Sequence, residues 1–223
     1  MRPWDSSAFN ELRGAVFRSD GSIVEAVRGR LTDDVLQLAG DGLLDAVKQG
    51  TPEAAELAAQ CAAALRERAW EGDEELADQL DAILNVRATP MLRPLPVDLE
   101  QLASLLEGDP VWGGGRIDLR TGDCWPESTD YEDEDEDEDR WLHVECVGSH
   151  DGYSDMELFI ATVEDPAVAE RLQIAIRGKG AFRRFKDVLS RWPEELQRYF
   201  SFTNERQLGR ARAWLAAAGY RPT

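Results

Sequence analysis

Residues 51–84 read TPEAAELAAQCAAALRERAWEGDEELADQLDAIL, a pattern typical of two amphipathic helices separated by a turn. Alanine and leucine are strong helix formers, and the small alanine side chain allows helices to pack closely. Apolar residues recur at helical spacing before and after the turn at Gly72-Asp73. Because the connection is short, the two helices are expected to be neighbours in a bundle or a short solenoid.

The same helical spacing extends toward the N-terminus, so residues 1–90 are predicted to form a helical module. Within it, Thr32 is the expected N-cap of a helix whose first turn contains two aspartates. Residues 91–97 are rich in proline and are predicted to form an extended linker. Residues 98–223 then form a second domain, in which Asp98 caps the first helix.

A small antiparallel sheet is predicted early in this second domain. Ile117 alternates with polar residues, and Gly122 supplies the positive φ that a short hairpin loop needs. Residues 141–147, WLHVECV, give the clearest strand. The rest is predicted to be helical, with a short helix opened by Pro193 and a last helix capped by Thr203. The expected fold class is α+β and predominantly helical, with an N-terminal helical module followed by a helical domain that contains the sheet.

Opposite charges are segregated along the chain, whose net charge is −19. Residues 1–166 carry 13 Lys/Arg and 39 Asp/Glu, whereas residues 167–223 carry 12 Lys/Arg and 5 Asp/Glu. The overall charge argues against bare nucleic acid as a partner of the whole molecule. Polarity of this kind between two parts of a chain indicates an interaction function.

The cysteines and the hydropathy indicate a cytoplasmic protein that is not associated with a membrane. Its 3 cysteines are far apart and form no CxxC pair, which argues against a disulfide framework. No apolar run is long enough for a membrane helix or a signal peptide.

Several motifs in the second domain resemble a known family. They are DLEQLASLLEG, the IDLRTGD hairpin with the acidic stretch after it, DMELFIATVEDP, GKGAFRRFKDVLSRWPEELQRYF and ERQLGRARAWL. Together they lie in residues 97–219, which resemble an uncharacterised bacterial protein family of unknown function. The resemblance implies a bacterial source and a shared fold, and it brings no established activity, catalytic residue or cofactor.

The first candidate binding site is the acidic loop 130–139, DYEDEDEDED, whose like charges keep it extended. It can attract a basic protein surface, mimic a phosphate backbone, or mask the protein's own basic face. The alternative is a solubilising loop with no specific role. The candidate residues are Glu132, Asp133, Glu134, Asp135, Glu136, Asp137, Glu138 and Asp139.

The second candidate is a basic surface that begins at Gly178-Lys179-Gly180. Glycines before a helix leave backbone N–H groups free to hold an anion. The alternative is a tight turn with its cations on a solvated face. The candidate residues are Lys179, Arg183, Arg184 and Lys186, joined by Arg206 and Arg210, which helical spacing puts on one face.

Metal binding and catalysis have weaker sequence support. Cys124, His143, Cys146 and His150 have a tolerable spacing for zinc, but residues 143 and 146 would point to opposite faces of a strand. The chain contains neither a Walker A loop nor a nucleophile elbow. No cofactor, metal ligand or catalytic residue is therefore predicted.

The sequence favours a non-enzymatic, acidic interaction or regulatory protein that binds a basic partner protein by electrostatic steering followed by apolar docking. One alternative is a nucleic-acid-binding regulator that uses the basic C-terminal face and is gated by the acidic loop. Another is a metal-dependent hydrolase. The identity of the partner and the oligomeric state stay open.

Overall fold

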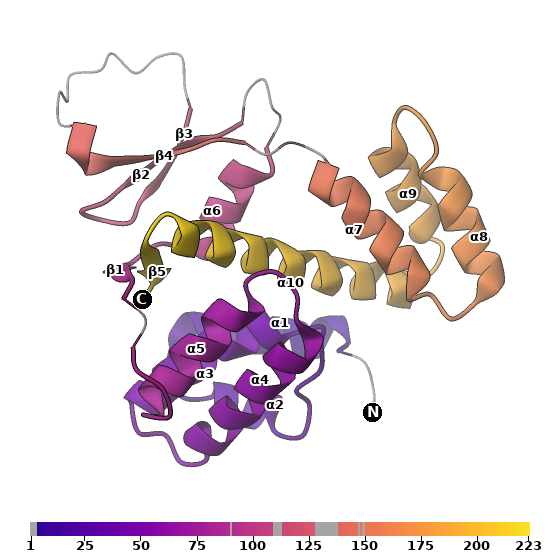
Figure 1. Ribbon diagram of the computed structural model, residues 1–223. Coiled ribbons are helices and arrows are strands. Elements are labelled where there is room, and N and C mark those ends of the chain that lie inside the picture. The colour runs from indigo at the N-terminus through magenta and orange to yellow at the C-terminus, as the bar shows by residue number, and fades with distance from the viewer. Residues whose placement is uncertain (1–3, 90, 109–112, 128–137, 147, 149) are drawn as a thin grey trace.

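The computed structural model describes residues 4–89, 91–108, 113–127, 138–146, 148 and 150–223 (Figure 1). Its fold is predominantly helical with small β elements, which confirms the predicted α+β class. Among the described residues, no helix combines the length and the apolar character needed to cross a membrane.

The N-terminal helices pack around α3. They are α1 (Ser6–Arg18), α2 (Ile23–Val27), α3 (Leu36–Lys48), α4 (Ala54–Arg68) and α5 (Asp73–Ile83). α3 contacts each of the others, and Leu36, Ala39 and Leu43 on it are completely buried. A helix that is apolar around most of its circumference belongs inside a bundle. α4 and α5 pack against each other across their short connection, as the sequence predicts.

The start of α3 differs from the prediction. The helix begins at Leu36, so Thr32 is not its N-cap, and the Thr32 carbonyl accepts the N–H of Val35 at 3.1 Å in a turn before the helix. The first-turn N–H groups of Gln37 and Leu38 donate instead to the carboxylate of Glu205. A side chain from the far end of the sequence has therefore taken the place of the local cap.

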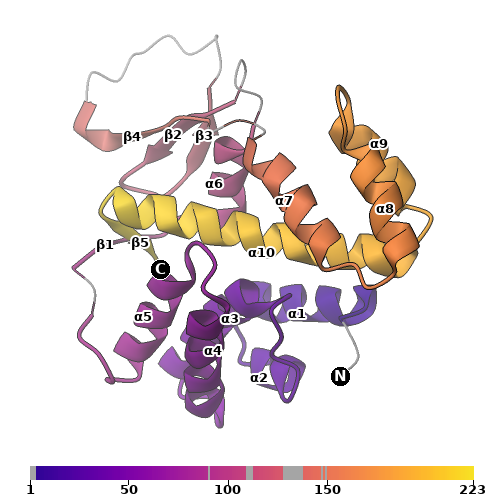
Figure 2. The ribbon, with the colours of Figure 1, turned by 45° about the vertical axis from the view of Figure 1, so that its right-hand side comes forward.

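α10 (Pro193–Ala217) is one continuous helix of 25 residues. The prediction of two helices is wrong, because Thr203 lies inside α10 and its hydroxyl donates to the carbonyl of Tyr199 at 3.0 Å. Figures 1 and 2 show α10 passing through the middle of the molecule, between the N-terminal helices and the elements of the second half.

The predicted antiparallel sheet is present, with strand order β3–β2–β4. It follows α6 (Leu99–Leu106) and comprises β2 (Gly115–Asp118), β3 (Cys124–Pro126) and β4 (Trp141–Val144), with a short 3₁₀ helix, η1 (Glu138–Arg140), before β4. Ile117 in the central strand pairs with Cys124 and Leu142. Gly122 has a φ of +80°, and a Cβ at this position would lie 2.1 Å from the carbonyl oxygen of Pro96, so the hairpin requires glycine.

α7 (His150–Ala161), α8 (Pro166–Ala175) and α9 (Ala181–Leu189) form a lobe with its own hydrophobic cluster. Its centre is aromatic, with Phe159 edge-on to Phe185 and Tyr199. Tyr199 comes from the first half of α10, whereas Leu208 and Leu215 in the second half pack with the N-terminal helices. α10 therefore joins two hydrophobic cores.

β1 (Arg93–Leu95) lies within the segment that the sequence predicts as a linker. It pairs in parallel with β5 (Tyr220–Pro222), and the Arg93 N–H donates to the Gly219 carbonyl at 3.0 Å. Leu95 and Val97 are buried in the same cluster as the N-terminal helices. The two hydrophobic cores therefore separate at α7 rather than at residues 91–97.

Gly209 provides a test of the contact between α10 and the turn before α5. A Cβ on Gly209 would lie 2.1 Å from the carbonyl oxygen of Glu71, which is backbone and cannot move aside alone. Gly209→Ala should therefore lower the free energy of unfolding by about 1–3 kcal/mol in urea titrations. Gly14→Ala is the control, because its Cβ meets the flexible end of Arg18, and it should raise stability by roughly 0.5–1 kcal/mol. Equal effects of the two substitutions would contradict the close approach.

Candidate functional site

A buried ionic network centred on Glu205 holds α10 against the N-terminal helices. The Glu205 carboxylate accepts the N–H of Gln37 at 2.6 Å and that of Leu38 at 3.0 Å, at the N-terminus of α3. It also pairs with Arg68 at 2.8 Å, and both side chains are almost completely buried. A carboxylate at a helix N-terminus satisfies N–H groups that have no acceptor within the helix and interacts favourably with the helix dipole.

The network continues on both sides of Glu205. Arg68 makes a two-pronged pair with Asp73, through contacts of 2.6 and 2.9 Å. Asp73 also accepts the side-chain amide of Gln37 at 2.8 Å, and the Gln37 side-chain oxygen accepts Nε of Arg212 at 2.9 Å. Arg212, which is buried, reaches Asp41 at 2.6 Å. The chain of contacts links α3, the end of α4, the start of α5 and α10.

Burial governs the protonation of the groups in and near this network. It raises the pKa of Glu205, and Arg68 and the two backbone N–H groups oppose that rise. Burial also raises the pKa of the nearby Cys61 thiol, which lies 3.6 Å from the Leu36 carbonyl oxygen. A buried thiol of this kind is a packing residue rather than a nucleophile.

Arg206 and Arg210 lie on one face of α10, as their spacing predicts, but that face packs against α6 and α7. Asp155 pairs with Arg206 at 3.0 Å and with Arg210 at 2.9 Å. Nε of Arg210 also donates to Glu107 at 2.9 Å. Arg210 is buried. These two arginines therefore hold the second half of the molecule together instead of extending a basic surface.

Arg184 closes the turn between α8 and α9. Its guanidinium donates to the carbonyls of Ala175, Arg177 and Gly178 at 3.2, 2.5 and 3.3 Å. These carbonyls come at the end of α8, where helices leave acceptors unsatisfied. The side chain therefore supports the glycine-flanked turn and does not present its charge freely to a ligand.

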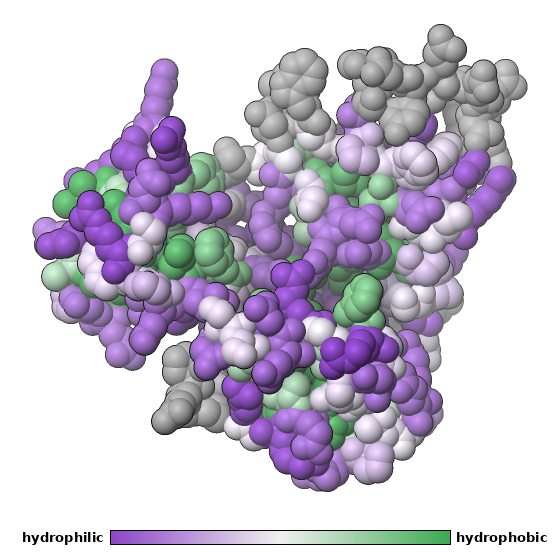
Figure 3. Space-filling view, turned by 180° about the vertical axis from the view of Figure 1, so that it is seen from behind, coloured by the Kyte–Doolittle hydropathy of each residue, from purple (hydrophilic) through white to green (hydrophobic). Residues whose placement is uncertain are grey.

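The remaining basic candidates are Lys179, in the turn between α8 and α9, and Arg183 and Lys186, on α9. We call residues 166–191 the basic lobe. The lobe has 7 Lys/Arg and 2 Asp/Glu, a net charge of +5, so the rest of the chain carries −24. Ile174, Phe182 and the neighbouring Phe200 are exposed there. Figure 3 shows apolar surface on this lobe bordered by hydrophilic surface. All seven cations of the lobe are exposed; besides Arg184, which bonds to the turn, they are Arg171, Arg177, Lys179, Arg183, Lys186 and Arg191.

The acidic candidates Glu132, Asp133, Glu134, Asp135, Glu136 and Asp137 lie outside the described residues. Glu138 and Asp139 belong to η1, and Asp139 is exposed. The strands β3 and β4, which come before and after the acidic run, belong to the sheet. Figures 1 and 2 place the sheet and the basic lobe at opposite ends of α10.

The zinc candidates are not gathered into a cluster. Within the described ranges, no group of three or more His, Cys, Asp and Glu side chains is arranged so that it could hold a metal ion. Cys146 contacts the Gly108 carbonyl at 2.9 Å. Burial raises the pKa of the Cys124 thiol to about 11.

Glu205→Gln tests the central network. A glutamine keeps the shape but loses the charge that pairs with Arg68, and its NH₂ group cannot accept an N–H from α3. Breaking a buried pair should lower the free energy of unfolding by about 3–5 kcal/mol in chemical denaturation. The matched control is Glu100→Gln, which breaks an exposed pair with Arg13 at 2.7 Å and should cost no more than about 1 kcal/mol. A loss of similar size in both variants would show that the buried pair has no special role.

Comparisons with known proteins cover the second half of the chain. Residues 126–223 match the model of an uncharacterised protein family, UPF0158. A UPF0158 protein from Pseudomonas aeruginosa is 27% identical over 130 residues, which are 56% of this chain and 84% of that protein. No solved structure matches the chain.

The matched region contains the basic lobe, α10 and β5, together with the motif GKGAFRRFKDVL. The resemblance to an uncharacterised protein family is thus confirmed, and over residues 126–223 the family that this chain matches is UPF0158.

Proposed function

We propose that this protein is a non-enzymatic interaction protein that binds a basic partner protein through its acidic surface. The observation that carries the proposal is the charge distribution: the basic lobe has a net charge of +5 and the rest of the chain −24. The value of −24 already includes the arginines of α10, and Arg206, Arg210 and Arg212 are paired with carboxylates of the same chain. A partner with a basic surface would be attracted over a distance of about one Debye length, roughly 10 Å at 0.1 M salt.

The N-terminal helices supply part of this acidic surface. Glu56, Glu67 and Glu71 on and beside α4 are exposed and form no ion pair with any described residue. Unpaired carboxylates of this kind contribute to long-range attraction without the cost of breaking an existing pair. The acidic loop 130–139 would add to the same field, since eight of its residues from Glu132 onward are acidic.

A salt-dependent pulldown tests this proposal. Immobilised protein should retain specific basic proteins from a bacterial lysate at about 50 mM NaCl and lose them at about 500 mM. A variant in which the carboxylates of residues 132–137 become amides should lose the same proteins at low salt. The measurement is quantitative mass spectrometry of the retained fraction.

The matched control for this variant changes an equal number of exposed carboxylates elsewhere to amides. They are Glu11, Glu157, Glu164, Glu170, Asp187 and Glu194. The control has the same net charge and should keep the partners. Retention that is unaffected by salt, or lost equally in both variants, would contradict a role for the acidic loop.

The basic lobe favours a second candidate function, which is nucleic-acid binding gated by the acidic loop. Lys179, Arg183 and Lys186 are exposed, and Phe182 beside them offers a ring for base stacking. Arg206 and Arg210 are no part of this candidate, since both are paired with Asp155.

Deleting residues 128–137 separates the two candidates. If the gate operates, the deletion should raise affinity for a fluorescent single-stranded oligonucleotide in anisotropy titrations, because a competing anion has been removed. Adding Lys179→Gln, Arg183→Gln and Lys186→Gln should abolish that gain. The same three changes at Arg18, Arg28 and Lys48, which are exposed on the N-terminal helices, should not. An unchanged affinity after the deletion would exclude the gate.

A further inference from the structure

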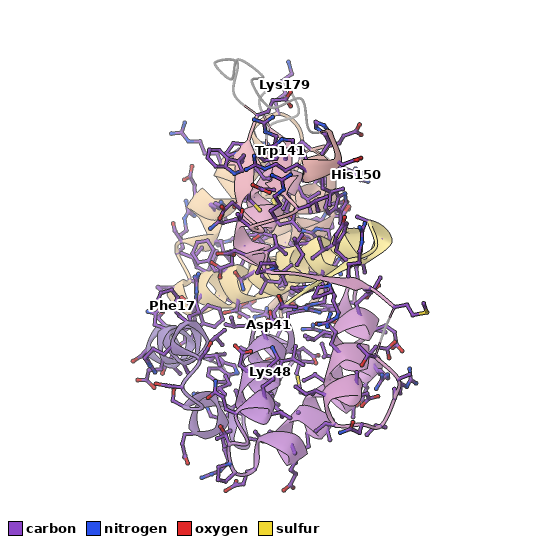
Figure 4. The ribbon with its side chains drawn as sticks, turned by 90° about the vertical axis from the view of Figure 1, so that its left-hand side faces the viewer. Phe17, Asp41, Lys48, Trp141, His150 and Lys179 are labelled. Atoms are coloured by element: carbon purple, nitrogen blue, oxygen red, sulfur yellow. The ribbon has the colours of Figure 1, made fainter. Side chains whose placement is uncertain are left out.

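A groove of about 730 Å³ lies between α1, α3 and α5, away from the acidic and basic surfaces described above. The start of α6 and the strand β5 complete its walls. Figure 4 shows Phe17, Asp41 and Lys48, which line the groove, on the N-terminal helices below α10. The volume falls within the range of about 300–1,000 Å³ that is typical of sites for small ligands.

Most of the groove is apolar. Its buried lining includes Leu38, Val97, Leu99 and Leu208, and Val16 and Leu44 are half-buried along its sides. Phe17 is 92% exposed and also lines the groove. A large aromatic side chain left in solvent loses the stabilisation that burial would give. An apolar ligand that covered this lining would therefore be stabilised by the burial of apolar surface.

The charged groups of the lining are largely occupied within the protein. Arg13 pairs with Glu100 at 2.7 Å, and Lys48 pairs with Asp45 at 3.0 Å. The Asp41 carboxylate accepts from Arg212 at 2.6 Å. The Asp98 carboxylate caps α6 by accepting the N–H of Glu100 and of Gln101, at 2.8 and 3.2 Å. These groups need no ligand to satisfy them.

Arg221 is different. It lines the groove, and its Nε is buried without a hydrogen-bond partner. Among the described residues, no carboxylate forms an ion pair with it. A guanidinium that has no counterion at the wall of an apolar groove attracts an anion, which its terminal N–H groups can bind in two-pronged fashion.

The pairing of β5 with β1 fixes the position of this arginine. Arg221 is opposite Pro94 in the register, and its neighbour Tyr220 is buried in the core beneath the guanidinium of Arg93, which lies 4.4 Å from the ring centroid. Because successive side chains of a strand point to opposite faces, burial of Tyr220 directs Arg221 away from that core. The cation is therefore held by the backbone at the wall of an otherwise apolar groove.

We propose that this groove binds a small amphipathic carboxylate, whose anionic head pairs with Arg221 and whose apolar body lies along Leu38, Leu44 and Phe17. The anionic head group is assigned from the unpaired guanidinium of Arg221, since the other charged side chains of the lining already have partners. The apolar body is assigned from the lining, and the small size from the volume. This ligand site is separate from the surfaces proposed above to bind a protein or a nucleic acid, so each can be tested without the other.

Decanoate and decanamide are suitable probes, because they have nearly the same shape and differ in charge. Isothermal titration calorimetry on the full chain should show decanoate binding at least about tenfold more tightly than decanamide, since a hydrogen bond to a charged group is involved. Arg221→Met should lower decanoate affinity about tenfold and leave decanamide affinity within about twofold. Leu44→Trp should abolish binding of both by filling the groove.

Arg28→Met is the matched control, since this arginine is exposed on the N-terminal helices and does not line the groove, and both affinities should be unchanged. Circular dichroism of each variant should show an intact fold. Equal affinity for the two probes in the wild-type protein, or no effect of Arg221→Met, would overturn the assignment of the head. If an apolar hexapeptide bound through its terminal carboxylate and decanoate did not bind, the proposal that the ligand is a small molecule would be contradicted. A dimer that dissociates in Leu44→Trp would instead make the groove an interface between two copies.

Discussion

The arrangement of this molecule depends on the contacts of the Glu205 carboxylate with the start of α3 and with Arg68. The carboxylate replaces a local cap at the start of α3 and neutralises the buried Arg68. α3 is the centre of the N-terminal helices, and α10 is the helix that both hydrophobic cores share. One side chain therefore fixes the position of α10 relative to the N-terminal bundle. Its removal would leave the first-turn N–H groups of Gln37 and Leu38 buried without an acceptor, and Arg68 would keep Asp73 as its carboxylate partner.

The same helix determines which charges reach the surface. On α10, Arg206 pairs with Asp155, Arg210 pairs with Asp155 and Glu107, and Arg212 pairs with Asp41. The charges of these three arginines are therefore paired within the protein. The net positive charge that stays accessible belongs to the basic lobe, at the opposite end of α10 from the sheet (Figure 1). Folding thus sharpens the charge separation, from one between two parts of the sequence to one between a small lobe and the rest of the surface.

Sequence patterns predicted the parts of this fold that depend on neighbours in the chain. The helix at Gly72-Asp73, the cap at Asp98 and the hairpin at Gly122 are all local, and all are present. The failures at Thr32 and Thr203 have different causes. At α3 a tertiary contact, the Glu205 carboxylate, takes the place of a local cap, whereas Thr203 bonds to the Tyr199 carbonyl inside a helix that continues through it. Glu205 and Arg212 lie in the apolar stripe of α10 with Phe202, Leu208 and Leu215. Two charged residues in an apolar stripe indicate a buried ionic network, but the sequence does not indicate which residues they pair with. The groove could not be predicted, because its lining comes from helices far apart in sequence.

Amide hydrogen exchange at the start of α3 tests the central claim most directly. First-turn amides of a helix normally exchange quickly because they have no acceptor within the helix. If Glu205 accepts them, the amides of Gln37 and Leu38 should be protected about as strongly as that of Leu43 in the middle of α3. The reference for an uncapped start is Phe182 in α9, which has no side-chain cap. Exchange of Gln37 and Leu38 as fast as that of Phe182 would contradict the account.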